Sequence, residues 1–424
     1  MERVHHGTPR PGWQAQIISE GMLYANVVTP DHKQVSYWRE GPFYRLPLSE
    51  QKLLEEAAKV LLQMCVEAGD HMIAHPSIMR RMGIPESAWP EIIRTWHEEP
   101  PSVYGRFDFR FGGECDMALQ DPSLRIPKLL EFNADTPTTL FESALTQWNW
   151  FDQAKHGDKD QWNFIHDALI AAWRRNISRY ESKTGQTVRT IHFVYTSDEQ
   201  TGEDLINTSY LADTAEQAGY KVKVGLIEDL IKSVSDDNGS FYYKDKDGEF
   251  VQIVFKLYPW EWLTKPAIAP ETYSPTTPHG TVWIEPPWKQ LWSNKGLLAV
   301  LWELFKNDPE KSQYLLPAYF ADEPHDLTSY VKKPLLSREG ANITIVNNGE
   351  AVVKTSGQYG GEGYVVQQYA PLPNFHSPFS GEDHHPMLGV WMIDGEPAGM
   401  GIRESGDLIT NNASFFAPHT LISD

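Results

Sequence analysis

Lys128-Leu-Leu-Glu-Phe-Asn-Ala-Asp-Thr-Pro-Thr-Thr139 is the stretch that decides the fold, and Tyr104-Gly-Arg-Phe-Asp-Phe109 precedes it along the chain. Both segments alternate apolar and polar residues, as half-buried strands do. The polar residues of each strand then share one face: Arg106 and Asp108 on the first, and Glu131, Asn133 and Asp135 on the second. Side by side, two such strands bring carboxylates, an amide and a guanidinium into a small volume.

Three carboxylates crowded into a partly buried site repel one another. A hard cation such as Mg²⁺ relieves this repulsion, because it prefers carboxylate and amide oxygens and often bridges to substrate phosphates. The pattern therefore predicts a magnesium-binding face. Periodicity alone is equally compatible with two ordinary strands that carry surface charges.

Length and charge limit the class of protein. A chain of 424 residues is long enough for two or three structural units with a sizeable core. It has no hydrophobic run near the ~20 residues of a transmembrane helix, and its first residues lack the apolar stretch of a secretory signal. We therefore expect no membrane association. The formal charge of −20 argues against nucleic acid as a partner.

The two cysteines, Cys65 and Cys115, provide neither a disulfide framework nor the spacing of a metal finger. A reducing cytoplasm is therefore the expected location. Cys65 falls on an apolar position of a helical pattern and is interpreted as a core residue.

Periodicity along the rest of the chain predicts mixed helices and strands. Ser49 is expected to cap a helix over 49–68 that Gly69 ends. Residues 190–195, 203–218 and 220–227 follow the strand–helix–strand order of a parallel unit. The other expected elements are helices at 87–97 and 297–305, a mainly helical region at 138–180, strands at 250–257, 341–346, 351–354, 364–369, 388–393 and 398–403, and a connection at 267–287.

A nucleotide site needs cations for the phosphates, backbone N–H groups in a tight turn and an apolar slot for the base. The last third of the chain offers such groups: Lys295, Lys332 or Lys333, Gly340, and a strand with Gln367 and Gln368. Neither the P-loop pattern nor the dinucleotide-binding glycine pattern is present. Taken singly, each lysine is as readily explained as a solvated surface residue.

Eight stretches, taken together, resemble the glutathionylspermidine synthase family, in particular its stand-alone acid–amine ligase members. They are Tyr-Gly-Arg-Phe-Asp at 104–108, Lys-Leu-Leu-Glu-Phe-Asn-Ala-Asp-Thr-Pro-Thr at 128–138, Phe-Lys-Leu-Tyr-Pro-Trp-Glu-Trp at 255–262, Trp-Ile-Glu-Pro-Pro-Trp-Lys at 283–289, Ser-Asn-Lys-Gly at 293–296, Lys-Lys-Pro-Leu-Leu-Ser-Arg-Glu-Gly-Ala-Asn at 332–342, Gly-Met-Gly-Ile-Arg-Glu at 399–404 and Leu-Ile-Thr-Asn at 408–411. The resemblance covers nearly the whole chain.

The resemblance implies an α+β chain with the ATP-grasp fold, glutathione synthetase-like, in which two lobes clamp ATP and an α/β unit is inserted. It implies four regions: a lead-in at 1–103, a metal-binding part at 104–190, an α/β substrate-side unit at 191–285 and an ATP-binding lobe at 286–424.

The resemblance also implies a ligase that forms carbon–nitrogen bonds and uses ATP and Mg²⁺, with two ions. The implied partners are a small carboxylic acid, peptide-like in some members, and a small amine. The substrate carboxylate attacks the γ-phosphate of ATP, an acyl phosphate forms, and the amine displaces phosphate. Such phosphoryl transfer depends on metals and cations more than on a protein nucleophile.

The family's functional residues carry over to matching positions. The implied magnesium ligands are Asp108, Glu131 and Asn133, and the implied catalytic arginines are Arg106 and Arg403. The implied ATP contacts are Arg106, Phe107, Asp108, Lys295, Lys333, Ser337, Arg338, Glu339, Gly340, Gln367, Gln368, Leu408, Ile409 and Thr410.

The chain also departs from the family's bifunctional members. Because only 103 residues precede the first motif, no N-terminal amidase is expected. Tyr258-Pro-Trp260 differs from the substrate-contact region of glutathionylspermidine makers, so the motifs imply neither glutathione nor spermidine. Asp198, Glu199 and Glu261 are candidates for binding a polyamine or are solvated surface carboxylates.

Two rival functions stay open. One is a non-catalytic or regulatory ATP-binding homologue that has lost its acid substrate. The other is a metal-dependent hydrolase built on the carboxylates of 106–135. The complete metal set favours the ligase over the first rival, and the second leaves the C-terminal lysines unexplained. The sequence does not identify the general base or the oligomeric state.

Overall fold

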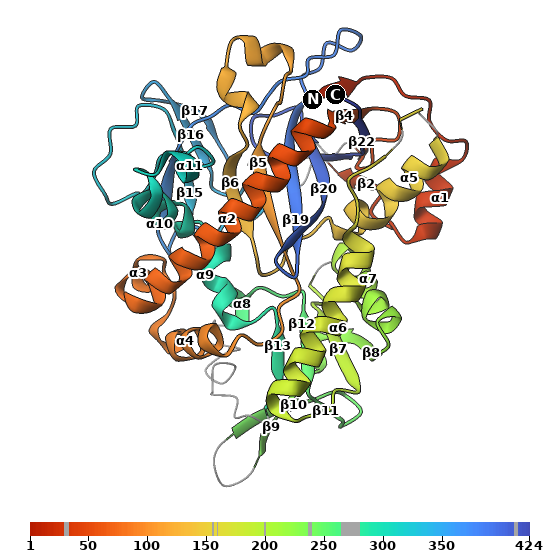
Figure 1. Ribbon diagram of the computed structural model, residues 1–424, viewed down its shortest axis with the longest axis vertical. Coiled ribbons are helices and arrows are strands. Elements are labelled where there is room, and N and C mark those ends of the chain that lie inside the picture. The colour runs from red at the N-terminus through yellow and green to blue at the C-terminus, as the bar shows by residue number, and fades with distance from the viewer. Residues whose placement is uncertain are drawn as a thin grey trace.

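The computed structural model describes residues 1–28, 34–154, 157–158, 160–198, 201–235, 240–263, 280–410 and 414–424. The three largest of six sheets organise these residues, and a long helix, α2 (Leu48–Ala74), runs diagonally across the front of the central one (Figure 1). The two termini lie close together at the top of the same view.

The central sheet contains the two polar strands. Its five strands run in the order β21-β20-β19-β5-β6, and all neighbours are antiparallel. The strands are β5 (Tyr104–Arg110), β6 (Lys128–Asn133), β19 (His385–Ile393), β20 (Glu396–Ser405) and β21 (Phe415–Ala417). The expected strand pair is thus confirmed, and it lies against a C-terminal hairpin that extends the predicted one by a few residues.

A second antiparallel sheet lies beside the first, in the order β14-β18-β15-β16-β17. It comprises β14 (Ala318–Phe320), β15 (Tyr330–Pro334), β16 (Thr344–Asn347), β17 (Glu350–Lys354) and β18 (Tyr364–Gln368). The helix α10 (Gly296–Phe305) packs against β14 and β18. The predicted helix and strands of this region are confirmed, with boundaries shifted by up to three residues.

A four-stranded parallel sheet forms the lower part of the molecule in Figure 1, in the order β13-β12-β7-β8. Its strands are β7 (Thr190–Tyr195), β8 (Lys221–Leu226), β12 (Ile253–Lys256) and β13 (Val282–Ile284), and α6 (Ile165–Thr184) and α7 (Glu203–Gln217) pack together beside it. The β-α-β prediction is confirmed. The predicted connection at 267–287 is wrong for 282–284, which form a strand, and residues 264–279 lie outside the described part of the chain.

The remaining elements are short or peripheral. They are β1 (Glu2–Val4), α1 (Trp13–Glu20), β2 (Asn26–Val28), β3 (Gln34–Ser36), β4 (Phe43–Pro47), α3 (Ser77–Arg81), α4 (Trp89–Glu98), α5 (Gln147–Ala154), β9 (Ile231–Ser235), β10 (Ser240–Lys244), β11 (Phe250–Val251), α8 (Trp260–Leu263), α9 (Gln290–Ser293), α11 (Pro309–Ser312), β22 (His419–Ile422), and single 3₁₀ or π turns at Glu86–Ala88, Asp116–Leu119, Pro122–Arg125, Glu142–Thr146, Ile227–Asp229 and Pro287–Lys289.

The helix α2 corrects two expectations. It begins at Leu48 without a side-chain cap from Ser49, and it continues past Gly69 to Ala74. A Cβ atom at position 69 would lie 2.0 Å from Cη2 of Trp96. The glycine is therefore there for close helix packing and not to end the helix.

Cys65 is fully buried on α2, which confirms its interpretation as a core residue. No helix in the described ranges is both long and apolar enough to cross a bilayer.

We predict that Gly69→Ala lowers the free energy of unfolding by about 1–2 kcal/mol. Alanine favours a helix interior over glycine by about 1 kcal/mol, but overpacking typically costs about 1–3 kcal/mol. The Trp96 ring has little room to move, because it packs edge-on against Trp288 and Trp292. Thermal and urea unfolding measure the change.

The matched control is Gly225→Ala in β8, where an added Cβ has no atom within 4 Å. It should leave the transition close to wild type. Equal behaviour of the two variants would contradict the packing role of Gly69.

Candidate active site

The polar face of β5 and β6 is organised by strand register. Arg106 pairs with Asn133 and Asp108 with Glu131 across the two strands. Residues directly opposite one another in an antiparallel pair have neighbouring Cβ atoms. The register therefore brings the four side chains together, as the alternation predicts.

Asp108 is fully buried, with two arginines on its carboxylate. Arg106 binds it with two parallel bonds, Nε to Oδ1 at 2.7 Å and Nη2 to Oδ2 at 3.0 Å. Arg403, from β20, donates Nη2 to Oδ2 at 2.6 Å. A buried carboxylate needs such partners, because an unpaired buried charge is very costly.

Glu131 has a separate partner. Lys295 Nζ lies 2.9 Å from its Oε2 and donates to the carbonyl of Ser337 at 2.6 Å. Asn133 Nδ2 bridges the two carboxylates, at 2.9 Å from Glu131 Oε1 and 3.1 Å from Asp108 Oδ2. Burial opposes ionisation of Glu131, but the charges of Lys295 and Lys333 and the Asn133 amide hold its pKa well below the usual range. Glu131 is therefore an anion at neutral pH.

Asp135 does not join this cluster. The strand β6 ends at Asn133, and Asp135 turns toward the parallel sheet. It accepts from Lys256 Nζ at 2.6 Å and from the backbone N–H of Trp260 at 2.9 Å. The shared face predicted for Asp135 is thus wrong, because the chain leaves the strand before the alternation reaches it.

A cavity of about 140 Å³ lies between the two antiparallel sheets. Most of the residues carried over as ATP contacts line it: Lys295, Lys333, Ser337, Glu339, Gly340, Leu408, Ile409 and Thr410, together with Glu131 and Arg403. Apolar side chains complete the wall: Val331, Ile343, Ile345, Leu372 and Met387. Cations and an apolar wall in one cavity suit a nucleotide. We call this cavity the nucleotide cleft.

Lys333 is buried at the base of the nucleotide cleft. Its Nζ donates to Gln367 Oε1 at 2.8 Å and to the carbonyl of Leu130 at 3.0 Å. Gln367 Nε2 in turn donates to the carbonyl of Leu129 at 2.9 Å. Burial lowers the pKa of Lys333 to about 8, with Glu131 raising it and Lys295 lowering it further.

Three of the carried-over residues lie elsewhere. Phe107 is buried on the opposite face of β5, stacked on Phe132 with ring centroids 3.9 Å apart. Gln368 is exposed at the end of β18. Arg338 lines a neighbouring pocket. Lys332, the sequence's alternative to Lys333, lies over the Tyr364 ring.

One loop lines the cleft and is bonded to a second loop beside it. The first, 335–343, joins β15 to β16; the second, 355–363, joins β17 to β18. Asn342 Nδ2 donates to the carbonyl of Tyr359, and Asn342 N to that of Ser356. Glu339, Gly340 and Asn342 have positive φ. We call 335–343 the covering loop.

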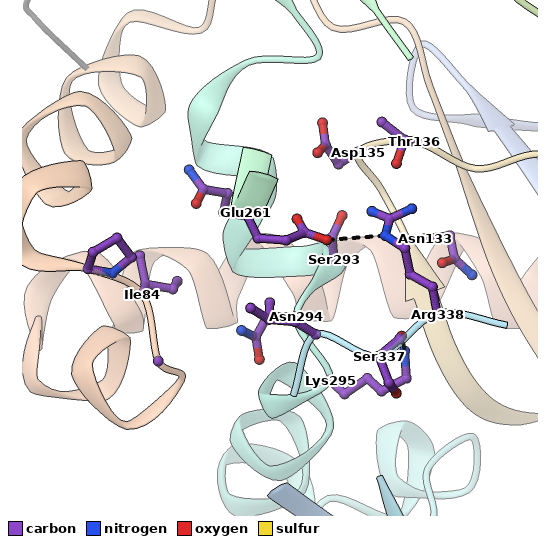
Figure 2. Close-up of a pocket in the computed structure, with 14 residues that line it drawn as sticks. Ile84, Asn133, Asp135, Thr136, Glu261, Ser293, Asn294, Lys295, Ser337 and Arg338 are labelled. Atoms are coloured by element: carbon purple, nitrogen blue, oxygen red, sulfur yellow. Dashed lines mark hydrogen bonds and ion pairs between the residues drawn. The ribbon is translucent and has the colours of Figure 1, made fainter. Parts of the chain in front are cut away.

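A second pocket, of about 270 Å³, adjoins the nucleotide cleft and shares Lys295 and Ser337 with it. Figure 2 shows Arg338 reaching from the covering loop toward Glu261 of α8, with Asn133, Asp135 and Thr136 beyond. Arg338 Nε lies 3.1 Å from Glu261 Oε1. We call this space the side pocket.

A carboxyl pair near Arg106, Glu142 and Glu203, was not predicted from the sequence. Glu142 is fully buried and accepts from the Tyr37 hydroxyl at 2.7 Å, while its Oε2 is buried without a partner. Burial, with the charges of Glu142, Asp204 and Glu339, raises the pKa of Glu203 to about 8. These residues are far apart in sequence, so no local pattern predicts their meeting. Of the carboxylates considered for an amine, Asp198 is exposed and Glu199 lies outside the described residues.

The donor set on β5 and β6 fits a hard cation. Asp108, Glu131 and Asn133 offer two carboxylates and an amide on one face, the ligand types that Mg²⁺ prefers. Within the described ranges, no group of three or more His, Cys, Asp and Glu side chains is arranged to hold a metal ion. Arg403 and Lys295 neutralise the two carboxylates instead, with the same sign of charge that a metal would bring.

Residues 4–422 match the family model described as glutathionylspermidine synthase preATP-grasp. The chain belongs to the glutathionylspermidine synthase family. The "Putative acid--amine ligase" of Haemophilus influenzae is 34% identical over 442 residues, covering 100% of both chains. A family relationship over the full length of both proteins confirms the expectation drawn from the motifs.

Two further relatives are longer than this chain. The trypanothione synthetase of Crithidia fasciculata is 26% identical over 83% of this chain and 52% of its own length. The bifunctional glutathionylspermidine synthetase/amidase of Escherichia coli is 23% identical over 89% of this chain and 58% of its own. The chain spans a little over half the length of these two proteins.

Among solved structures, a glutathione synthetase-like effector from Globodera pallida matches with a TM-score of 0.56 at 12% identity, covering 97% of this chain and 95% of that one. This likeness shows the fold. The family and the fold together confirm an α+β, ATP-grasp, ATP-dependent ligase of the carbon–nitrogen class. The four sequence regions and the individual site roles stay predictions.

We predict that ATP affinity falls as pH rises above about 8. The protonated form of Lys333 attracts phosphates, and its pKa of about 8 in the free protein means that binding at higher pH must take up a proton. Lys333→Met should weaken ATP binding about tenfold to a hundredfold, as expected for a charge-assisted hydrogen bond. It should also remove the pH dependence. Calorimetric titration with Mg–ATP between pH 7 and 9.5 measures both.

Lys332→Met is the matched control, because the neighbouring lysine packs on Tyr364 instead. It should bind ATP nearly as wild type does. If Lys333→Met binds ATP with wild-type affinity, or if its ATP affinity still depends on pH as in wild type, Lys333 does not contact the phosphates.

Proposed function

We propose that this ligase activates a small carboxylic acid with ATP as an acyl phosphate and then transfers the acyl group to a small amine. The observation that carries the proposal is the continuity of the site. The nucleotide cleft and the side pocket meet at Lys295 and Ser337, beside the paired polar faces of β5 and β6. An acid in the side pocket would therefore adjoin the phosphate end of the cleft.

The metal ligands proposed are Asp108, Glu131 and Asn133. Mg²⁺ at this face, with two ions, would neutralise phosphate charge during transfer. Glu131 lines the nucleotide cleft and Asn133 the side pocket, so the set borders both substrates. Asp108 lies beneath them and orients Arg106 and Arg403.

The two arginines are proposed to stabilise charge on the transferred phosphoryl group. Their planar guanidinium groups stay charged and bind oxyanions in a fixed geometry. Arg106 is held by Asp108 and by the Thr139 hydroxyl at 3.2 Å, which aligns its fork. Arg403 lines the nucleotide cleft directly. Fixed donors of this kind need no reorganisation as charge develops.

The amine end is proposed to lie at Glu142 and Glu203. A free amine is mostly an ammonium at neutral pH and must lose a proton before it attacks an acyl phosphate. An ammonium beside these two carboxyls would favour their ionised forms, and the anion of a carboxyl whose pKa is about 8 is a competent base near neutrality. The bond to Tyr37 fixes Glu142 as the immobile member of the pair.

The rival functions fit the site less well. A non-catalytic ATP-binding homologue has no use for the buried Arg106–Asp108–Arg403 arrangement, which carries a desolvation cost. A hydrolase that uses no nucleotide has no use for the apolar slot that ends in Lys333 and Lys295.

We predict phosphate release that requires ATP, an acid and an amine together. A panel of acids, with glutathione first, and amines, with spermidine first, tests it by phosphate assay and by mass spectrometry of the amide. EDTA and Glu131→Ala should each remove nearly all turnover, because EDTA removes the metal ion and the substitution removes one of its proposed ligands. Ester hydrolysis without ATP would favour the hydrolase, and ATP binding with no turnover across the panel would favour the non-catalytic homologue.

A second prediction concerns Glu203 and pH. Its pKa is about 8 in the folded protein and near 4.5 when unfolded, so from pH 5 to 8 the unfolded state holds fewer protons. Glu203 therefore costs stability as pH rises through that range. Glu203→Gln should lack this loss, so the difference between its Tm and that of wild type should increase from pH 5 to 8. Its amine-dependent turnover should be lower than that of wild type.

Glu216→Gln, an exposed change on the same helix, is the control. It should show neither effect. A Tm difference between Glu203→Gln and wild type that stays constant with pH would contradict the raised pKa of Glu203. Unchanged turnover would show that Glu203 takes no part in the amine step.

A further inference from the structure

One ion pair crosses the side pocket between two parts of the fold. Arg338 belongs to the covering loop, which joins β15 to β16, and Glu261 belongs to α8, which follows the parallel strand β12. The side chains are 30% and 15% exposed. The dashed line in Figure 2 marks this contact across the pocket.

The two partners differ in how firmly they are held. Asp135 ties α8 to the end of β6, since it binds both Lys256 and the backbone N–H of Trp260 in fully buried contacts. Glu261 therefore stands on a fixed element. Arg338 stands on the loop between β15 and β16, and connecting loops are more mobile than the elements they join. If the pair opens, Arg338 is the partner that moves.

Arg338 is also the natural partner for a substrate carboxylate. Among the described residues lining the side pocket, Lys295 and Arg338 are the cations. Lys295 is already bonded to Glu131 and to the carbonyl of Ser337. Burial opposes the charge on Arg338, but Glu261 and Asp135 raise its pKa. The guanidinium is thus a strong carboxylate site that a carboxylate of the protein itself fills.

We propose that the Glu261 carboxylate occupies the site on Arg338 that the carboxylate of the acid substrate takes. When the acid binds, its carboxylate displaces Glu261 from Arg338. The inference rests on the proposed function. Exchange of one carboxylate for another keeps Arg338 paired throughout, so its guanidinium is never left without a counter-ion in the pocket. Loss of the Glu261 contact frees the covering loop from α8 and lets it close over the nucleotide.

The exchange links ATP use to the presence of acid. Without acid, water is the competing nucleophile: its oxygen attacks the γ-phosphorus, the bond to ADP breaks, and phosphate, ADP and a proton result. Restraining Arg338 on α8 keeps the covering loop open and this idle reaction slow. Glu261 is therefore a positioning residue that acts through Arg338.

The test is Glu261→Gln, which keeps size and hydrogen bonding and removes the competing charge. The KM for the acid should fall about twofold to fivefold, the range expected for losing a partly exposed ion pair. Idle ATP hydrolysis should rise by a similar factor, and kcat at saturating acid and amine should stay near wild type. Deuterium exchange of residues 335–343 without ligand should quicken. Glu261→Asp, which retains charge but shortens the reach, should fall between the two proteins.

Two controls separate the exchange from general loosening. Glu362→Gln weakens bonds that the second loop makes to Leu336 N and Gly360 N, at 3.3 and 2.8 Å. It should quicken exchange in the loops without lowering the KM for the acid. Glu216→Gln removes one surface charge and should change nothing.

The results divide cleanly. A raised KM in Glu261→Gln means that Glu261 binds the acid itself, and unchanged KM and idle rate mean that the pair is only structural; either overturns the proposal. If wild type shows no acid- and amine-dependent release across the panel, the proposed function fails. The proposal about Glu261 is then judged on idle hydrolysis and exchange, and it falls if Glu261→Gln alters neither.

Discussion

A single buried carboxylate, Asp108, sets the geometry on which the candidate site depends. Two guanidinium groups converge on it, one from its own strand and one from β20, which lies beyond β19 in the sheet. The strand between them carries Gly389 directly opposite Asp108. A Cβ there would lie 2.7 Å from Arg106 Cδ, so only glycine leaves room for the arginine to lie along the sheet. The register of the three strands and this glycine together fix where Arg106 lies relative to Asp108.

The same face balances charge by pairing and not by solvation. Arg106 and Arg403 neutralise Asp108, and Lys295 neutralises Glu131. The Arg403–Asp108 pair joins β20 to β5, and the Lys295–Glu131 pair joins the start of α10 to β6. Because Lys295 also donates to the carbonyl of Ser337, the same charges hold the covering loop in place. Pairs of this kind can exchange partners for a nucleotide or metal at little net cost, because the charges stay matched throughout.

Sequence reasoning succeeded where a feature is local and periodic. The alternation around Arg106 and Glu131 predicted both strands and their shared face, because a period of two fixes which side chains point the same way. It failed where tertiary contacts override a local signal. Gly69 looks like a helix end but makes room for Trp96, and Asp135 continues the alternation after the strand has ended. Glu142 and Glu203 meet only through folding, so no spacing along the chain indicates them.

The turn after β6 borders both substrate ends of the proposed site. Asn133, Asp135 and Thr136 face the side pocket, where the acid is proposed to lie. A few residues later, the Thr138 carbonyl and the Thr139 hydroxyl accept from Arg106 on the side of Glu142.

The parallel sheet unit fixes this segment at both ends. Lys256 holds Asp135, and Asn207 of α7 accepts from the backbone N–H of Leu140 at 3.0 Å. The sheet of β14 to β18 contributes the groups proposed to bind phosphate but little of this turn. Changes in the α/β unit can therefore alter which acid and amine meet at the reacting carbon without disturbing how ATP is held, which is a physical basis for one fold joining different pairs of substrates.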